Sequence, residues 1–220
     1  MSPSPVTEID PSTASSHHHQ QQQQHRSYLI ITNISKRQNV KSLLQLAAAY
    51  GCTTVFVVGQ KKFEFDPDAE GTDLPSILQN AVRNGRMTIV KFDKLEDCVD
   101  HIKSIPCCDD VATAEGNCTA ENIGANNTAQ TTKRPTIPII GVEIDNSSKN
   151  LEEEPFTSSV AFMMGNEGSG MSSKQTAACD GFIRISQYGG GTASLNVSVA
   201  AGLVLHRFFH WSRGDGVKQC

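Results

Sequence analysis

The sequence lacks several features that mark whole classes of protein. No run approaches the roughly twenty apolar residues of a membrane span, and the N-terminal segment has no apolar stretch typical of a secretory signal. The seven cysteines show no repeated Cys-x-x-Cys spacing, so neither a zinc site nor a disulfide framework is indicated. Basic charge is not in excess, since the formal net charge is −4. These absences predict a reduced protein of the cytoplasm or nucleus, without a metal site or a broad basic surface.

Hydrophobic residues are scarce, and their scarcity is local. They make up 38% of the 220 residues, which is low for a globular domain. Residues 1–26 are rich in Pro, Ser, His and Gln, and residues 107–135 in Asn, Thr and Ala, so neither segment can bury enough apolar surface to fold. We therefore expect a disordered tail at 1–26 and one domain at 27–213 with a disordered insertion at about 107–135. The end of the chain, 214–220, is expected to be flexible.

Strand-like and helix-like patterns alternate along the rest of the chain. The expected strands are 27–33, 53–59, 87–92, 136–144, 160–164 and 181–186, and the expected helices are 37–50, 74–84, 94–104, 172–179 and 194–211. Continuous apolar runs such as 53–59 are typical of strands buried on both faces. The alternation predicts an α/β fold, with a mostly parallel sheet flanked by helices.

Two apolar runs in the second half of the chain stop at glycine-rich loops. The first stops at residues 165–170 (GNEGSG), and the second stops within 188–192 (YGGGT), which leads into a long apolar helix. Glycines let main-chain groups approach a ligand, and the carboxyl ends of parallel strands often hold ligands. The N–H groups at the expected helix start, Ser194, would add affinity for an anionic group. Together the loops indicate a small-molecule site.

Two common glycine motifs are excluded at the first loop. Met171 and Ser172 stand where a nucleotide-binding P-loop would have Lys followed by Ser or Thr. The glycines beside Ser169 are immediately adjacent to it, which does not match the Gly-x-Ser-x-Gly elbow of hydrolases.

Three blocks in order resemble a known family. Residues 165–172 (GNEGSGMS), 179–185 (CDGFIRI) and 194–201 (SLNVSVAA) resemble the second and third motifs of the SpoU/TrmH branch of the SPOUT RNA methyltransferases. The resemblance implies a C-terminal trefoil knot that binds S-adenosylmethionine. It also implies an enzyme that methylates a ribose 2′-hydroxyl of tRNA or rRNA. Members of the family dimerise, so we expect a homodimer through the C-terminal helix and knot that also binds RNA.

The resemblance gives roles to nine residues by their positions. The expected cofactor-binding residues are Val142, Gly165, Ile185 and Leu195. The expected catalytic residues are Asn39, Lys41, Glu167, Ser194 and Asn196. Some of these residues have simpler interpretations, since Ile185 and Leu195 suit core packing and Ser194 suits a helix N-cap. Asn196 is harder to explain in this way, because a buried amide in an apolar helix needs partners.

The first motif departs from the family pattern, which reads Asn-x-Gly-x-x-x-Arg. Asn39 matches the Asn, but Lys41 stands at the glycine and Gln45 at the arginine. In the family the arginine is thought to assist deprotonation of the attacking hydroxyl, whereas glutamine is neutral and no useful base. Lys41 lies one turn before Gln45 and Arg37 a further turn back, so either could supply the positive charge.

Three outcomes of this departure stay open. Lys41 supplies the charge, within a basic patch of Lys36, Arg37, Lys41, Lys61 and Lys62. Alternatively, RNA phosphate and Glu167 suffice at a reduced rate. Finally, the chain has lost catalysis and acts as a dimeric scaffold or RNA-binding protein. We expect an active enzyme, because both cofactor-binding blocks are intact; a methyltransferase of another polar substrate is a further alternative.

Overall fold

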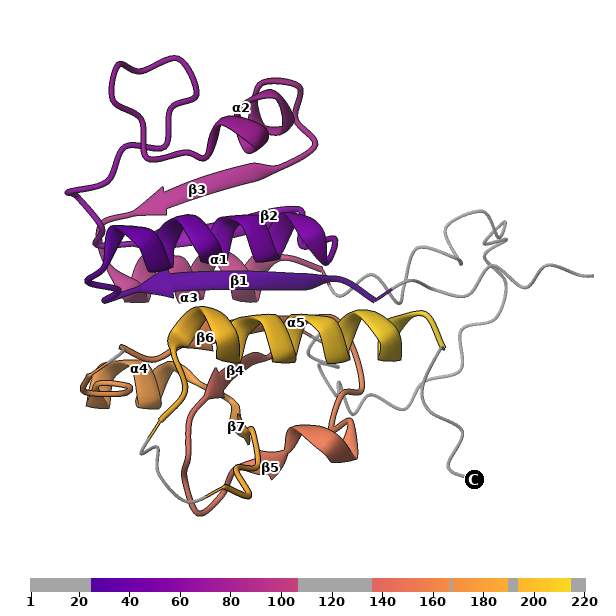
Figure 1. Ribbon diagram of the computed structural model, residues 1–220. Coiled ribbons are helices and arrows are strands. Elements are labelled where there is room, and N and C mark those ends of the chain that lie inside the picture. The colour runs from indigo at the N-terminus through magenta and orange to yellow at the C-terminus, as the bar shows by residue number, and fades with distance from the viewer. Residues whose placement is uncertain (1–24, 107–135, 167, 190–193, 215–220) are drawn as a thin grey trace, which may run out of the picture.

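The computed structural model describes residues 25–106, 136–166, 168–189 and 194–214 (Figure 1). The strands are β1 (Ser27–Thr32), β2 (Thr54–Val58), β3 (Thr88–Phe92), β4 (Ile139–Val142), β5 (Lys149–Asn150), β6 (Val160–Met164) and β7 (Gly181–Arg184). The helices are α1 (Arg37–Ala49), α2 (Ser76–Arg83), α3 (Leu95–Ser104), α4 (Ser173–Ala178) and α5 (Val197–Ser212), with a 3-10 turn, η2, at Leu151–Glu153. The disorder expected at 1–26, 107–135 and 214–220 falls almost wholly outside the described residues and stays a prediction.

The strands form one parallel sheet in the order β3-β2-β1-β6-β4-β7-β5. Every strand pair in it is parallel. All strands therefore end at the same edge of the sheet, on the left of Figure 1. The predicted α/β fold with a mostly parallel sheet is confirmed.

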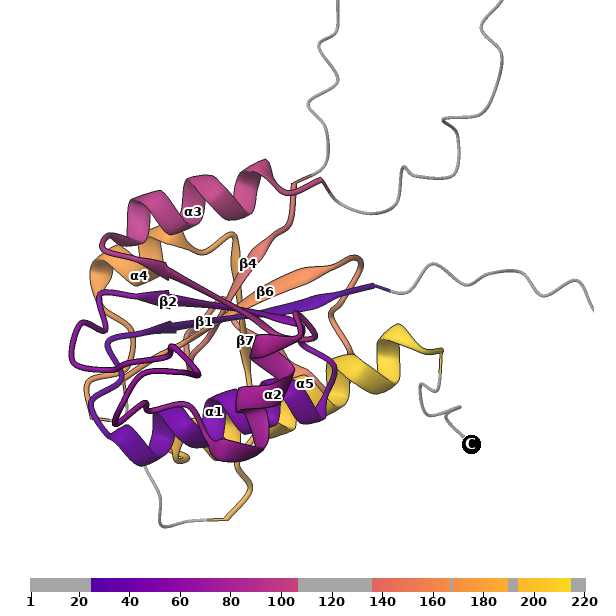
Figure 2. The same cartoon turned by 90° about the horizontal axis from the view of Figure 1, so that it is seen from above.

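Helices cover both faces of the sheet, which explains the continuous apolar strands. Helices α1, α2 and α5 lie on one face, and α3 and α4 on the other (Figure 2). All six residues of β1 are buried. Because consecutive strand residues point to opposite faces, Leu29 belongs to the core cluster beneath α1 and α5, while Ile30 belongs to the cluster beneath α3.

Two expected features of the sequence need correction. Helix α5 begins at Val197 rather than Ser194, because Asn196 is the residue that caps it: the Asn196 side chain accepts a hydrogen bond from the Ser198 N–H at 2.9 Å. Ser194 is therefore not the N-cap. Strand β5 and the turn η2 were not expected, since elements of two and three residues are too short to show a period.

Candidate functional site

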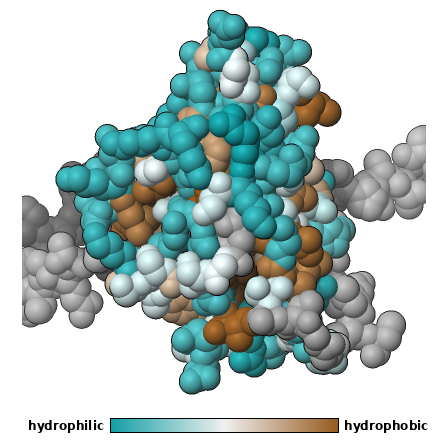
Figure 3. Space-filling view, turned by 60° about the vertical axis from the view of Figure 1, so that its left-hand side comes forward, coloured by the Kyte–Doolittle hydropathy of each residue, from teal (hydrophilic) through white to brown (hydrophobic). Residues whose placement is uncertain are grey.

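A cavity of about 450 Å³ opens at the carboxyl ends of β4, β6 and β7. It is lined by all four predicted cofactor-binding residues, Val142, Gly165, Ile185 and Leu195, and by the predicted catalytic residue Ser194. Figure 3 turns this edge of the molecule toward the viewer; its surface is mainly hydrophilic, with separate hydrophobic patches. The first glycine-rich loop thus lines this cavity, as expected for a strand end of a parallel sheet, and Gln187 and Ser194, on either side of the second loop in the sequence, line it too.

The first loop requires its glycines for its own packing. The loop closes through paired hydrogen bonds, from the Asn166 N–H to the Gly170 carbonyl at 2.9 Å and back from the Gly170 N–H at 3.0 Å. A Cβ on Gly165 would lie 3.0 Å from the Gly170 carbonyl carbon. A Cβ on Gly170, whose φ is +67°, would lie 2.6 Å from Oε2 of Glu143. These two glycines are therefore fixed by the loop itself, before any ligand binds.

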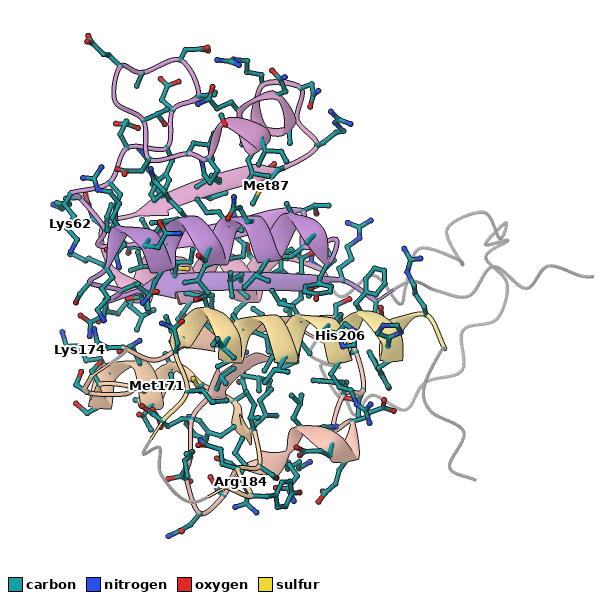
Figure 4. All side chains as sticks on the ribbon, in the orientation of Figure 1. Lys62, Met87, Met171, Lys174, Arg184 and His206 are labelled. Atoms are coloured by element: carbon teal, nitrogen blue, oxygen red, sulfur yellow. The ribbon has the colours of Figure 1, made fainter. Side chains whose placement is uncertain are left out.

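Glu143 is a site residue that the sequence analysis missed. Its Oε2 accepts a hydrogen bond from the Met171 N–H at 2.9 Å, and its Oε1 accepts one from the Ile144 N–H at 3.0 Å. It is half-buried and lines the cavity, and Met171 is labelled beside this edge in Figure 4. A carboxylate directly after Val142, at the end of an expected strand, was the available signal. Glu143 anchors the glycine loop to the end of β4.

The loop also continues into a capped helix. Ser172 caps α4 by accepting a hydrogen bond from the Gln175 N–H, while the Gln175 side chain accepts one from the Ser172 N–H at 3.0 Å. Gln175 is buried and its Nε2 donates to the Met164 carbonyl at 3.5 Å. The cavity-forming loop is therefore tied at both ends to β6 and α4.

The first and third motifs meet at two asparagines. Asn196 donates a hydrogen bond from Nδ2 to Oδ1 of Asn39 at 3.3 Å. Asn39 is buried, with 5% of its surface exposed. Asn196 is exposed, so the expectation of a buried amide inside an apolar helix is wrong: it precedes the helix and partly satisfies its own polar atoms by capping. The structure thus brings together two of the five predicted catalytic residues, next to Ser194 on the rim.

Lys41 and Gln45 lie elsewhere on α1. Lys41 is half-buried and has no hydrogen-bond or ion-pair partner among the described residues. Gln45 is exposed and lines a groove between α1 and α5, not the cavity at the strand ends. Lys41 does not line that cavity either. Glu167 lies outside the described residues.

The basic patch expected around the first motif is partly neutralised. Arg37 forms an ion pair with Asp73, whose side chain is 2% exposed, and Lys61 lies 3.2 Å from Asp93. Lys62 donates to the Ser35 carbonyl at 2.8 Å. Lys36 and Lys41 keep their charge unpaired among the described residues.

Three described cysteines are free thiols with little nucleophilic character. Burial raises the pKa of Cys52 and of Cys98 to about 12. Burial and the neighbouring Asp180 carboxylate raise the pKa of Cys179 to about 12. Within the described ranges, no group of three or more His, Cys, Asp or Glu side chains could hold a metal ion. No described helix is both long enough and apolar enough to cross a membrane.

Comparison with known proteins finds a family model that matches part of the chain. Residues 112–206 match the model of the SpoU rRNA Methylase family. The resemblance to SpoU/TrmH is confirmed over this segment. The SpoU segment contains the glycine loop, Glu143 and Asn196, whereas Asn39, Lys41 and Gln45 precede it. No curated protein matches the chain.

Solved structures of SpoU-type enzymes share the fold. The SpoU methyltransferase AviRb from Streptomyces viridochromogenes, in complex with AdoMet, is 19% identical with a TM-score of 0.57, covering 88% of this chain and 59% of that chain. A TrmH/SpoU tRNA modifying enzyme from A. aeolicus is 18% identical with a TM-score of 0.57, covering 89% and 78%. An RNA 2′-O ribose methyltransferase is 18% identical with a TM-score of 0.54, covering 90% and 60%. This chain thus spans about three fifths of the length of two of these three proteins.

Proposed function

We propose that this protein is an S-adenosylmethionine-dependent RNA methyltransferase that acts on a ribose 2′-hydroxyl of tRNA or rRNA. The observation that carries the proposal is the cavity at the carboxyl edge of the sheet, which gathers Val142, Gly165, Ile185 and Leu195 from three separate strand ends and the start of the last helix. The SpoU match over residues 112–206 supports the same reading.

The chemistry of the cavity fits this cofactor. Val142, Ile185 and Leu195 offer apolar surface for an adenine ring, and Gly165 presents main-chain atoms. S-adenosylmethionine carries a sulfonium and an ammonium group, both of which favour a nearby carboxylate. Among the described residues that line the cavity, Glu143 is the one with a negatively charged side chain.

The asparagine pair and Ser194 would orient the acceptor. S-adenosylmethionine would supply an electrophilic methyl group when bound, so the chain's own residues must place a ribose hydroxyl toward it, and the proton of that hydroxyl would pass to water or to a phosphate of the RNA. Asn39 and Asn196 can hold a hydroxyl by donating and accepting hydrogen bonds, but an amide is no base. Lys41 lies outside the cavity lining but two positions from Asn39 on α1, and its ammonium, unpaired among the described residues, would stabilise the negative charge that develops on the oxygen once RNA is bound.

A second copy of the chain would cover the groove between α1 and α5. This groove of about 750 Å³ has a mainly apolar surface, and Val199 and Leu203 on it are 52% and 44% exposed. Exposed apolar surface of this kind marks interaction sites. In such a dimer Gln45 lies at the interface, which gives a neutral residue there a packing role. Homodimerisation through this face is part of the proposal.

The trefoil knot is proposed from the strand order. Strand β4 lies between β6 and β7, so the chain passes from β6 across β4 to β7 before α5 returns to pack on α1. Residues 190–193, which lie between β7 and α5 in the sequence, are outside the described residues.

One observation favours a second candidate, a catalytically silent dimer that binds RNA. Gln45, which stands where the family has its arginine, neither carries charge nor lines the cofactor cavity. In that case cofactor binding persists without methyl transfer.

Two measurements test the proposal. Calorimetric titration with S-adenosylmethionine should show binding with one site per chain, and no binding at all refutes the enzyme. Transfer of a labelled methyl group to bulk tRNA and rRNA should then be seen, with the methylated position resistant to alkaline hydrolysis. Lys41→Ala should lower transfer at least tenfold, whereas Ile77→Ala, at an exposed position of α2, should not. Cofactor binding without transfer to either RNA supports the silent dimer.

Sedimentation tests the dimer separately. Wild type should sediment as a dimer, and Leu203→Glu should sediment as a monomer because a buried carboxylate at the groove is costly. A wild-type monomer at micromolar concentration contradicts this part of the proposal.

A further inference from the structure

A second cavity lies at the opposite end of the strands. It has a volume of about 820 Å³ and is bounded by the first residues of three strands, Ser27, Thr54 and Thr88, and by the ends of α1 and α5. The end of α5 and the start of β1, which bound it, lie on the right of Figure 1, whereas the carboxyl ends of the strands, which bound the cofactor cavity, lie on the left. The proposed methyl transfer makes no use of it.

The lining of this second cavity is cationic. Arg26, Arg86 and Arg213 line it, all three are exposed, and no described carboxylate pairs with any of them. No Asp or Glu is among the described residues that line the cavity. This is unusual in a chain whose formal net charge is −4. Three positive charges without a described carboxylate partner are therefore gathered at this end of the sheet.

Two of the three guanidinium groups are held by neighbours. The Arg213 guanidinium carbon lies 4.2 Å from the centroid of the Phe209 ring, and the Arg86 Nε donates to Asn84 Oδ1 at 3.2 Å. Interaction with the helix dipole explains an arginine at the C-terminus of α5, but not Arg26 or Arg86, which precede strands. The helix dipole alone therefore does not account for the three arginines of this cavity.

We propose that this arginine cavity binds the phosphodiester backbone of the RNA substrate. Arginine pairs with phosphate through planar, bidentate hydrogen bonds, and the hydroxyls of Thr53 and Thr88 on the same lining are further phosphate donors. Small-molecule sites are lined mainly by apolar side chains with few polar groups, which this lining is not. The inference rests on the proposed function in taking RNA as the partner.

The spacing of the two cavities suits one RNA. Helix α5 has 16 residues, begins at Val197, which lines the cofactor cavity, and ends beside the arginine cavity. At about 1.5 Å per residue it separates them by about 24 Å. The arginine cavity would hold a part of the RNA distant from the methylated nucleotide, and so would add affinity without reading the reacting base.

The test compares two double variants that remove the same charge. Arg86→Gln/Arg213→Gln removes two cavity arginines, and Lys94→Gln/Lys149→Gln removes two exposed lysines elsewhere. Binding of fluorescent bulk tRNA is measured by anisotropy at several salt concentrations. The arginine variant should bind at least tenfold more weakly, and its slope of log affinity against log salt should fall by about 1.4 to 1.8. The lysine variant should bind nearly as wild type does.

Other arms separate the alternatives. Arg86→Lys/Arg213→Lys keeps the charge and should recover most of the affinity, which also excludes a folding defect. Equal weakening by the arginine and lysine pairs overturns the proposal, as does competition by polyglutamate as strong as that by tRNA at equal charge. S-adenosylmethionine binding should be unchanged in every variant. If the cofactor does not bind wild type while tRNA binding still depends on the arginines, the proposed function fails and this inference stands.

Discussion

Asn196 Nδ2 lies 3.3 Å from Asn39 Oδ1, so one hydrogen bond joins residues 157 positions apart. The same Asn196 side chain caps α5 through its Oδ1, which accepts the Ser198 N–H at 2.9 Å. Its oxygen therefore stabilises a helix while its nitrogen reaches the first motif. These two roles can be separated by substitution.

Asn196→Ser should keep the stability of the protein and lose its activity. Serine retains a capping oxygen but has no amide to reach Asn39. We expect a free energy of unfolding within about 0.5 kcal/mol of wild type, and methyl transfer at least tenfold lower. Asn196→Ala should show the same loss of transfer together with a loss of about 1 kcal/mol in stability. Full activity of either variant would remove Asn196 from the site.

Glu143→Gln should weaken cofactor binding. The carboxylate accepts N–H groups from both Ile144 and Met171, whereas an amide has only one acceptor oxygen and would point its NH₂ at one of these donors. The glycine loop should loosen, and the dissociation constant for S-adenosylmethionine should rise about tenfold in calorimetry. Glu96→Gln, an exposed carboxylate on α3, is the matched control and should bind as wild type does. An unchanged Glu143→Gln would show that the loop holds its shape without this anchor.

Phe162→Ala should cost about 3 to 5 kcal/mol of unfolding free energy. Phe162 on β6 is fully buried, and its ring meets those of Phe156 and Phe208 at centroid distances of 5.9 and 5.5 Å. Truncation leaves a cavity between the sheet and α5. Urea unfolding measures the loss. Ile77→Ala, with a side chain that is 75% exposed, should change stability by no more than about 0.5 kcal/mol.

Glu64 should contribute a pH-dependent stability. The Lys91 ammonium at 2.8 Å and the N–H groups of Asp66 and Phe65 lower the pKa of Glu64 from 4.5 to about 2. A carboxyl whose pKa is lower in the folded state stabilises the fold above its unfolded pKa, and that contribution is lost as pH falls toward the folded pKa. Glu64→Gln should therefore have a lower Tm than wild type at pH 7. The gap should close between about pH 4.5 and 2; a gap that stays constant across this range contradicts the assignment.

The fold could be predicted from the sequence because its strands are buried on both faces. A continuous apolar run such as residues 160–164 is typical of a strand buried on both faces, and β6 has the same bounds as this run. Helix boundaries that are set by a side-chain hydrogen bond were harder to predict from the sequence. Ser194 and Asn196 are both good capping residues, and only the three-dimensional position of Ser198 decides that Asn196 caps α5.

For the candidate site too, the sequence predicted the positions of some residues but not of others. The residues contributed by strand ends, Val142, Gly165 and Ile185, line one cavity because parallel strands end at a common edge. The directions in which side chains on α1 point did not follow from their spacing in the sequence. Lys41 and Gln45 are one turn apart on α1, yet Gln45 faces the groove beside α5 and neither lines the cavity. The contact of Glu143 with Met171 spans 28 positions and leaves no periodic signal in the sequence.

Helix α5 fixes the distance between the two cavities. Because it is one uninterrupted helix of 16 residues packed along α1, the distance between its ends cannot adapt to the RNA. An oligonucleotide too short to span about 24 Å could enter the cofactor cavity without reaching the arginines. With the proposed function and the proposed RNA site, the protein would select RNAs partly by size, preferring folded RNAs over short fragments that carry the same target nucleotide.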